Sequence, residues 1–179
     1  MPVTPFHMGP GLLIKSVLQG WFSLIIFGWA QLLMDIQPVL AALTGRGSLH
    51  GFSHTWLGAT LIAIIAAWTG KWVFHLCMRF MDRDFTPYQK QLFDVPARLT
   101  TGICMCSACI GTFSHVLLDS IMHADLEPLF PISTENHLLL IISISALYKL
   151  CVYTGIAGAV VFFCVRLVLS GYRTAGKSS

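Results

Sequence analysis

Charged residues are scarce in this chain of 179 residues. Lys, Arg, Asp and Glu make up 11% of it, hydrophobic residues make up 55%, and the mean hydropathy is +0.73. A soluble domain usually carries about 25% charged residues. This composition therefore excludes an ordinary soluble protein, and we expect an integral membrane protein.

Several other features are missing. The chain has no Pro- or Ser-rich linker and no internal repeat, so we expect a single membrane-embedded domain over residues 1–179. It has no basic run with interleaved aromatic residues, so nucleic acid is not an expected partner. The first apolar region contains Lys15 within the apolar run and is followed by no small-residue cleavage site, so we expect it to remain in the mature protein.

The six cysteines do not form a disulfide framework. All of them fall in or beside apolar segments, where a buried thiol behaves as a small hydrophobic side chain. The run containing Cys104, Cys106 and Cys109 could hold a soft ion such as Cu(I). A helix would not present these three together, because Cys106 points away from the face that Cys104 occupies.

Four apolar regions are long enough to cross a bilayer as helices, which takes about 20 predominantly apolar residues. They are 12–34, 56–77, 99–118 and 138–169. The last is longer than one span needs and contains Lys149, which we expect to be paired or to reach the interface. The expected fold is an all-α, polytopic integral membrane protein with about four transmembrane or re-entrant helical segments.

Basic residues are unevenly distributed among the connections. Arg46 is the one basic residue in the connections 35–55 and 119–137. The remaining connection and the C-terminal end contain Arg79, Arg83, Lys90, Arg98, Arg173 and Lys177. Basic residues in short loops stay in the cytoplasm. We therefore expect a cytoplasmic C-terminus, with the connections 35–55 and 119–137 together on the outer face.

Those two outer connections hold most of the acidic residues and histidines. They contain Asp35, His50, His54, Asp119, His123, Asp125, Glu127, Glu135 and His137. His115 lies just inside the membrane at the same level. A spacing of four residues places His115, Asp119 and His123 on one face of a helix. Polar groups in hydrocarbon are costly unless they pair or bind something, so this stripe favours a binding site.

Imidazole and carboxylate groups together suit zinc, manganese, iron or nickel. We expect Asp35, His54, His115 and Asp119 to converge as ligands of a divalent metal. His50 is also four residues from His54, but Gly51 and the preceding residues indicate a loop, so His54 is the better placed. The alternative is that these histidines are interfacial or core side chains, which is the usual role of a lone histidine such as His75 or His137.

Four short motifs occur in a defined order. They are Pro5-Phe6-His7, Asp35-Ile36-Gln37-Pro38, Gly51-Phe52-Ser53-His54-Thr55 and Ser114-His115-Val116-Leu117-Leu118-Asp119. In this order they resemble the bacterial family of predicted membrane-bound metal-dependent hydrolases, one member of which is an SOS-induced inner-membrane protein. That family is similar to the zinc-dependent phospholipases C and the fungal zinc nucleases.

The resemblance implies a multi-pass protein of the bacterial inner membrane whose metal ligands are His7, Asp35, His54, His115 and Asp119, with Asp119 bridging two ions. The sequence departs from the pattern at Gln37, where a second acid is usual, and at His50, where Arg is common. The number of ions is therefore one or two. His123, Asp125 or Glu127 could supply ligands for the second.

The expected function is metal-dependent hydrolysis of a phosphoester, with zinc as the expected ion and a phospholipid or lipid-linked substrate. Asp35 would be both a ligand and the catalytic general base. The alternative is a divalent-metal transporter or metal-binding membrane protein without catalysis, although the apolar interior offers few polar groups for a path. A purely structural role is a third interpretation. The sequence leaves the oligomeric state open.

The N-terminus presents a conflict. If 12–34 is one straight helix, a rise of about 1.5 Å per residue places His7 about 40 Å from Asp35, on the opposite side of the membrane. A break near Gln19-Gly20 would resolve it, because glycine weakens a helix and Lys15 disfavours a spanning segment. We favour this re-entrant hairpin, in which the chain enters from the outer side and returns through 21–34.

Overall fold

Helices form all of the regular secondary structure in residues 5–93 and 99–175, the parts of the chain that the computed structural model describes. Four of them are long and apolar enough to cross a membrane, which confirms the expected all-α membrane architecture. These are α2 (Leu24–Thr44), α3 (Trp56–Asp84), α5 (Thr101–Met122) and α6 (Ile144–Ala175). The shorter elements are α1 (Met8–Leu18), α4 (Pro87–Leu92) and the 3-10 turns Gln19–Trp21 and Phe52–His54.

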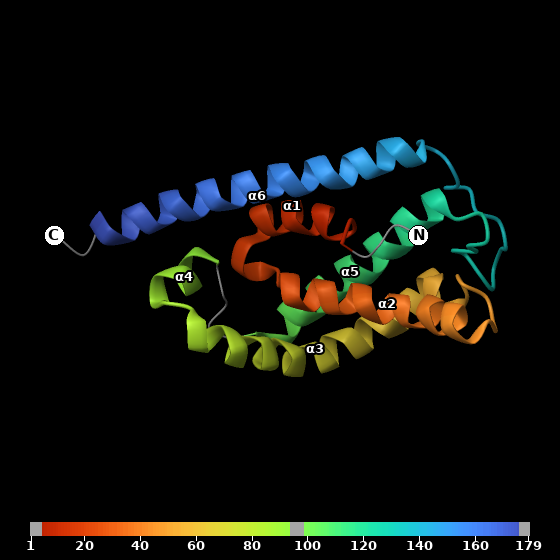
Figure 1. Cartoon of the computed structure of the whole chain (residues 1–179), viewed down its shortest axis with the longest axis horizontal. Helices are drawn as coiled ribbons and strands as arrows, with labels where there is room; N and C mark the ends of the chain where they lie inside the picture. The colour runs from red at the N-terminus through yellow and green to blue at the C-terminus, as the bar shows by residue number, and fades with distance from the viewer. Residues whose placement is uncertain (1–4, 94–98, 176–179) are drawn as a thin grey trace.

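The long helices lie side by side along the longest axis of the molecule (Figure 1). Helices α2, α3 and α5 pack against one another, while α6 lies along the short helix α1. The core between α2, α3 and α5 is rich in small side chains, including Ala30, Ala63, Ala66 and Ala108. Small residues allow helix backbones to approach closely, which is the usual way that helices associate in membranes.

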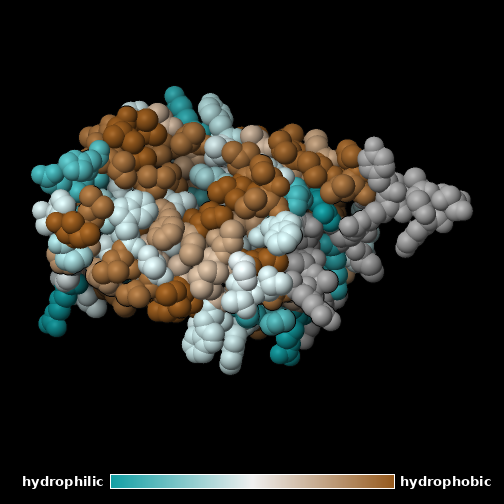
Figure 2. Space-filling view, turned by 180° about the vertical axis from the view of Figure 1, so that it is seen from behind, coloured by the Kyte–Doolittle hydropathy of each residue, from teal (hydrophilic) through white to brown (hydrophobic). Residues whose placement is uncertain are grey.

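The outward surface of the bundle is strongly hydrophobic. Large apolar side chains stand exposed on all four long helices, among them Trp68, Trp72, Leu43 and Val168. Hydrophobic residues form large patches on the face seen in Figure 2, with hydrophilic residues scattered between them. Soluble monomers rarely expose apolar patches this large to water, so the exposed helix faces suit contact with lipid.

The first apolar region is a hairpin. The chain leaves α1 at Leu18 and turns through Gln19, which has a φ of 45°, before α2 begins at Leu24. The straight span over 12–34 is therefore wrong, and the break near Gln19-Gly20 is confirmed. The ammonium group of the buried Lys15 stabilises the turn by donating hydrogen bonds to the carbonyl oxygens of Gln19 (2.7 Å) and Phe22 (3.0 Å).

Helix α2 continues beyond the expected end at Met34. It passes through Pro38 and stops at Thr44, where Gly45 adopts a left-handed conformation (φ 63°) and its N–H donates to the carbonyl of Ala41 (2.9 Å). Proline removes one backbone donor, but the apolar residues after it continue the helix. Asp35 therefore lies within α2 instead of in a connection 35–55.

The other three long helices also begin or end at residues that differ from those expected. Helices α3 and α5 start within two residues of expectation and extend beyond it, whereas α6 starts at Ile144 instead of Leu138. Residues 138–142 form turns and bends instead, because Leu140 has a φ of 55° and its N–H donates to the carbonyl of Ile121 (2.9 Å). Arg98 and Lys177, used above to orient the chain, lie outside the described residues.

Helix α1 is held against α6 by close backbone contacts. A side chain at Gly9 would collide with the carbonyl of Cys151, and one at Gly158 would collide with the backbone of Leu13. Any larger residue at these two positions would therefore push the helices apart. Since His7 immediately precedes α1, this packing also determines where the His7 ring lies.

Candidate metal centre

Four segments that are distant in the sequence bring five side chains together. His7 precedes α1, Asp35 lies in α2, His54 ends the 3-10 turn before α3, and His115 and Asp119 lie one turn apart in α5. We call these five residues the primary cluster. The shared position of His7 and Asp35 follows directly from the hairpin, because α2 runs back past the level at which α1 begins.

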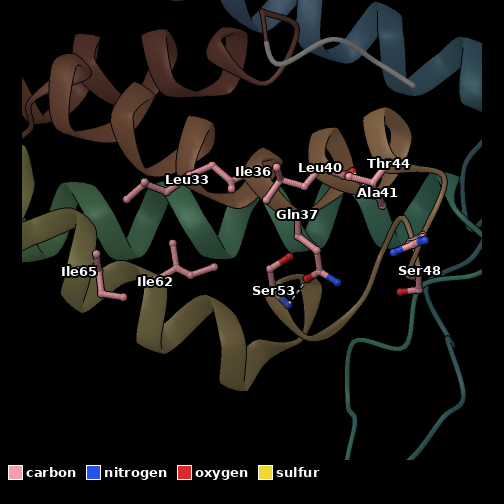
Figure 3. A pocket seen from close by; sticks show the side chains of 12 residues that line it. Leu33, Ile36, Gln37, Leu40, Ala41, Thr44, Ser48, Ser53, Ile62 and Ile65 are labelled. Atoms are coloured by element: carbon pink, nitrogen blue, oxygen red, sulfur yellow. Dashed lines mark hydrogen bonds between the residues drawn. The ribbon is translucent and has the colours of Figure 1, made fainter.

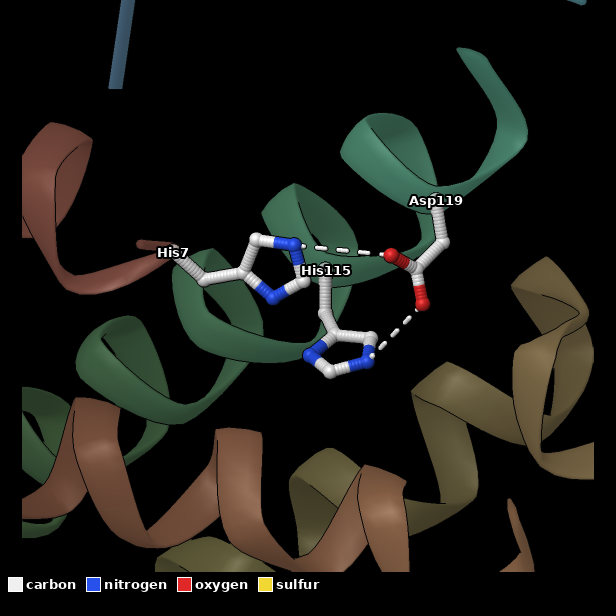
Figure 4. Close-up of side chains that lie close together, drawn as sticks. All are labelled: His7, His115 and Asp119. Atoms are coloured by element: carbon white, nitrogen blue, oxygen red, sulfur yellow. Dashed lines mark ion pairs between the residues drawn. The ribbon is translucent and has the colours of Figure 1, made fainter. Parts of the chain in front are cut away.

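The carboxylate of Asp119 is the centre of the primary cluster. Its Oδ1 lies 3.4 Å from Nε2 of His7, and its Oδ2 lies 3.4 Å from Nε2 of His54 and 3.2 Å from Nε2 of His115. Figure 4 shows the rings of His7 and His115 approaching the two oxygens, one each. Oδ1 of Asp35 lies 3.3 Å from the same Nε2 of His115.

Most of the primary cluster is buried, and several of its polar atoms are unsatisfied. Among the described residues, Nε2 of His54, Nε2 of His115 and Oδ1 of Asp119 have no hydrogen-bond partner. A buried polar atom without a partner costs about 1–3 kcal/mol. A cation could take either of two positions, because one ligand atom each from His7, His115 and Asp119, or from Asp35, His54 and His115, lie within 4.8 Å of one another.

Two of the three ring nitrogens that do not face Asp119 have partners, whereas Nδ1 of His7 has none among the described residues. Nδ1 of His115 is bonded to the side-chain oxygen of Gln31, whose NH2 group donates to the carbonyl of Gly111 (3.1 Å) and to Oγ of Ser114 (3.3 Å). Nδ1 of His54 is bonded to Oγ of Ser53 (2.9 Å). Such outer partners orient metal-binding imidazoles and select their tautomers.

Gln31 was not among the sequence-predicted site residues. It is a fully buried polar residue within an apolar run, four positions before Asp35. That spacing puts both side chains on one face of α2, which is the signal that could have found it.

Burial lowers the pKa of His7 and of His54, two histidines outside the spanning helices, and so favours their neutral form. It lowers the pKa of His7 to about 4, with the nearby His115 adding to the effect. Neutral imidazole is the form that binds metal, so both rings are ready to ligate at pH 7.

A second group of residues lies next to the primary cluster. Helix α5 ends at Met122 and His123 has an extended backbone (φ −110°, ψ 115°), so His123 does not continue the helical face of His115 and Asp119 as expected. Its ring instead stacks on His50, with 4.1 Å between ring centroids, and Nδ1 of His50 lies 2.9 Å from Oδ2 of Asp125. We call His50, His123 and Asp125 the secondary cluster.

The remaining candidates lie outside both clusters. His137 forms an exposed pair with Glu135, with 3.1 Å between Nε2 and Oε2. Glu127 is exposed and belongs to none of the three groups of described residues that could hold an ion.

An apolar groove of about 430 Å³ lies between α2 and α3 (Figure 3). Its walls include Leu33, Ile36 and Leu40 from α2 and Ile62 and Ile65 from α3, and polar residues lie at one end. These are Thr44, Arg46 and Ser48.

One residue of the groove wall, Ser53, also contacts the primary cluster. The side-chain oxygen of Gln37 accepts a hydrogen bond from the N–H of Ser53 (3.0 Å), and Ser53 contacts His54. Ser53 therefore contacts both the groove and the ring of His54.

The fold and the site together define a helical, membrane-type protein with buried His and Asp groups that could hold a metal ion. Comparison with protein-family models, curated proteins and solved structures finds no match. The resemblance to the membrane-bound metal-dependent hydrolases thus depends on the motifs that contain His7, Asp35, His54, His115 and Asp119.

Proposed function

We propose that this protein is a metal-dependent hydrolase of the bacterial inner membrane that cleaves a phosphoester in a phospholipid or lipid-linked substrate. The observation that carries the proposal is the buried carboxylate of Asp119, which three imidazoles approach within 3.4 Å. Two of these, His54 and His115, direct toward it a buried Nε2 that lies in an ion pair but makes no hydrogen bond. The motif resemblance supplies the reaction class.

The donor set fits a divalent ion of the zinc type. His7, His54 and His115 offer nitrogen ligands and Asp35 and Asp119 offer oxygen ligands, enough for one or two ions. Zinc, when bound, lowers the pKa of water and offsets negative charge on phosphoryl oxygens.

The two carboxylates of the primary cluster have different surroundings. The side chain of Asp119 is 6% exposed, whereas that of Asp35 is 27% exposed. Asp119 therefore holds and orients the three imidazoles. Asp35 is the carboxylate that solvent and substrate can reach, so it is suited to accept a proton from the attacking water as general base.

The groove between α2 and α3 supports a substrate with an acyl chain. Its apolar walls suit hydrocarbon, and its size lies in the usual range for small-molecule sites. Arg46 at its polar end suits a phosphate, because guanidinium forms charge-assisted hydrogen bonds with phosphate oxygens. The placement of basic residues along the chain supports a site on the outer membrane face and a cytoplasmic C-terminus.

Transport of a divalent metal is the alternative. It would need ligands that continue across the bilayer. Beyond the primary cluster, the buried polar residues along α1 and the start of α2 include neutral Ser16 and Ser23 and the cation Lys15. A buried ammonium group repels a passing cation, so this interior favours hydrolysis over transport.

Phosphate release tests the proposal. Purified protein with zinc should release inorganic phosphate from phosphatidic acid in mixed micelles, or a phosphorylated headgroup from other phospholipids, and a chelator should abolish this release. Asp35→Asn should lower the rate by about 10²-fold or more, the usual contribution of a general base, while most of the metal remains bound. Glu135→Gln is the matched control, because Glu135 is exposed and lies outside both clusters.

No release from a broad set of lipid phosphoesters, combined with zinc accumulation in proteoliposomes, would overturn the hydrolase proposal and favour transport.

A further inference from the structure

The secondary cluster joins two loops that are far apart in the sequence. His50 lies in the connection between α2 and α3, and His123 and Asp125 follow the end of α5. One ligand atom from each of the three lies within 4.8 Å of the others. His50 is buried, whereas the side chain of Asp125 is 55% exposed, so the cluster is open to solvent on one side.

A simple hydrogen-bonded pair does not account for this arrangement. Nδ1 of His50 lies 2.9 Å from Oδ2 of Asp125, which would satisfy one nitrogen of one ring. The ring of His123 adds a second imidazole, stacked on His50 with 28° between the ring planes. Two imidazoles and one carboxylate form the three-ligand set of catalytic zinc sites, which leave a coordination position open.

We propose that His50, His123 and Asp125 bind a second divalent ion of the zinc type, which exchanges with solvent more readily than an ion in the primary cluster. The exposed side of Asp125 gives the ion a path to solvent, whereas the ligands around Asp119 are buried. Binding of this ion does not require that the protein is a hydrolase.

The two clusters adjoin through a pair of histidines. The ring centroids of His50 and His54 are 5.2 Å apart. A phosphate bound at one cluster would therefore be near the other. If the proposed function holds, the second ion would offset charge on the same phosphoester.

His50 is the most informative residue to change. Arg at this position would place a positive charge next to His54 but would offer no lone pair to a metal ion. His50→Arg therefore separates ligation from a general need for positive charge. His123→Ala and Asp125→Asn remove the other two ligands, and His137→Ala is the control, since His137 is an exposed histidine paired with Glu135.

The test is a titration of metal-stripped, full-length protein in detergent with Zn²⁺ against a chromophoric chelator. Wild type and His137→Ala should bind two ions in distinguishable steps. His50→Arg, His123→Ala and Asp125→Asn should each lose the weaker step and keep the tighter one. Retention of the tighter step also shows that these variants are folded.

His115→Ala separates failure of this proposal from failure of the primary site. If wild type binds a single ion that His115→Ala loses and the three secondary variants keep, the primary cluster is a metal site and the second site does not exist. Two binding steps that survive in both His50→Arg and His123→Ala would also overturn the proposal. Loss of only the tighter step in His115→Ala would support two separate sites.

Discussion

The side-chain oxygen of Gln31 bonds to Nδ1 of His115 and thereby directs Nε2 of His115 toward Asp35 and Asp119. The NH2 group of Gln31 is held by the carbonyl of Gly111 and by Ser114, so the amide cannot turn over without losing both bonds. His115 is therefore presented to the primary cluster in one tautomer. A residue of α2 therefore orients a candidate metal ligand that belongs to α5.

Replacing Gln31 should weaken metal binding without removing a ligand. We expect Gln31→Met to lower zinc affinity by about 10- to 100-fold, the usual effect of losing an outer-shell partner, because His115 can then rotate or change tautomer. Competition with a chromophoric chelator measures the affinity. Gln89→Met in α4, far from the cluster along the chain, is the control. Equal affinities in wild type and Gln31→Met would contradict the assigned role.

Removal of a primary ligand should lower both metal content and thermal stability. We expect Ala at His54, His115 or Asp119 to reduce zinc occupancy sharply, as measured by elemental analysis of purified protein. Chelation should lower the melting temperature of wild type in detergent, because an ion that binds only the folded state stabilises it by mass action.

His75→Ala provides the matched control for that experiment. His75 is exposed on α3 and belongs to none of the groups of described residues that could hold an ion. Equal zinc content in wild type, the three ligand variants and His75→Ala would exclude the primary cluster as a metal site.

The hairpin predicts which residues are accessible from the same side of the membrane. In a cysteine-free background, we expect Pro5→Cys and Ser48→Cys to react alike with a membrane-impermeant thiol reagent in intact cells. Tyr88→Cys in α4 should react only after permeabilisation. Protection of Pro5→Cys together with Tyr88→Cys would place His7 on the opposite side from His54 and remove it from the site.

The buried ammonium group of Lys15 should contribute to folding of the hairpin. We expect Lys15→Met to lower the free energy of unfolding by about 1–3 kcal/mol, because the carbonyl oxygens of Gln19 and Phe22 would lose a buried donor. The melting temperature in detergent measures the change. The control is Lys71→Met, since Lys71 bonds to Thr101 at an exposed position. Similar melting temperatures for the two variants would rule out a special role for Lys15.

Stability of the metal-free protein should fall below about pH 6.5. Burial lowers the pKa of His7 from 6.5 to about 4, so the unfolded chain binds more protons than the folded one between these values. The contribution of neutral His7 to the free energy of unfolding is therefore fully present above pH 6.5 and is lost as the pH falls toward 4. His7→Gln should therefore show a smaller decrease in melting temperature between pH 7.5 and pH 5. An unchanged pH dependence would contradict the burial of a neutral His7.

The sequence alone determined the class of fold and part of the site. The length of the apolar regions predicts four spanning helices, because hydrocarbon requires about 20 apolar residues in a helix. The four-residue spacing of His115 and Asp119 predicts their shared helix face, since it depends only on helix geometry. Lys15 and Gly20 indicated the break in the first region, because a charge and a flexible residue both oppose a spanning helix.

The tertiary structure decided the rest, because the deciding contacts join residues far apart in the chain. Helix α2 continues through Pro38, and α5 ends at Met122 so that His123 turns toward His50. Gln31 contacts His115 across 84 positions, and His50 contacts Asp125 across 75. Local periodicity describes the face of a single helix, whereas these pairings depend on how the helices and their loops pack together.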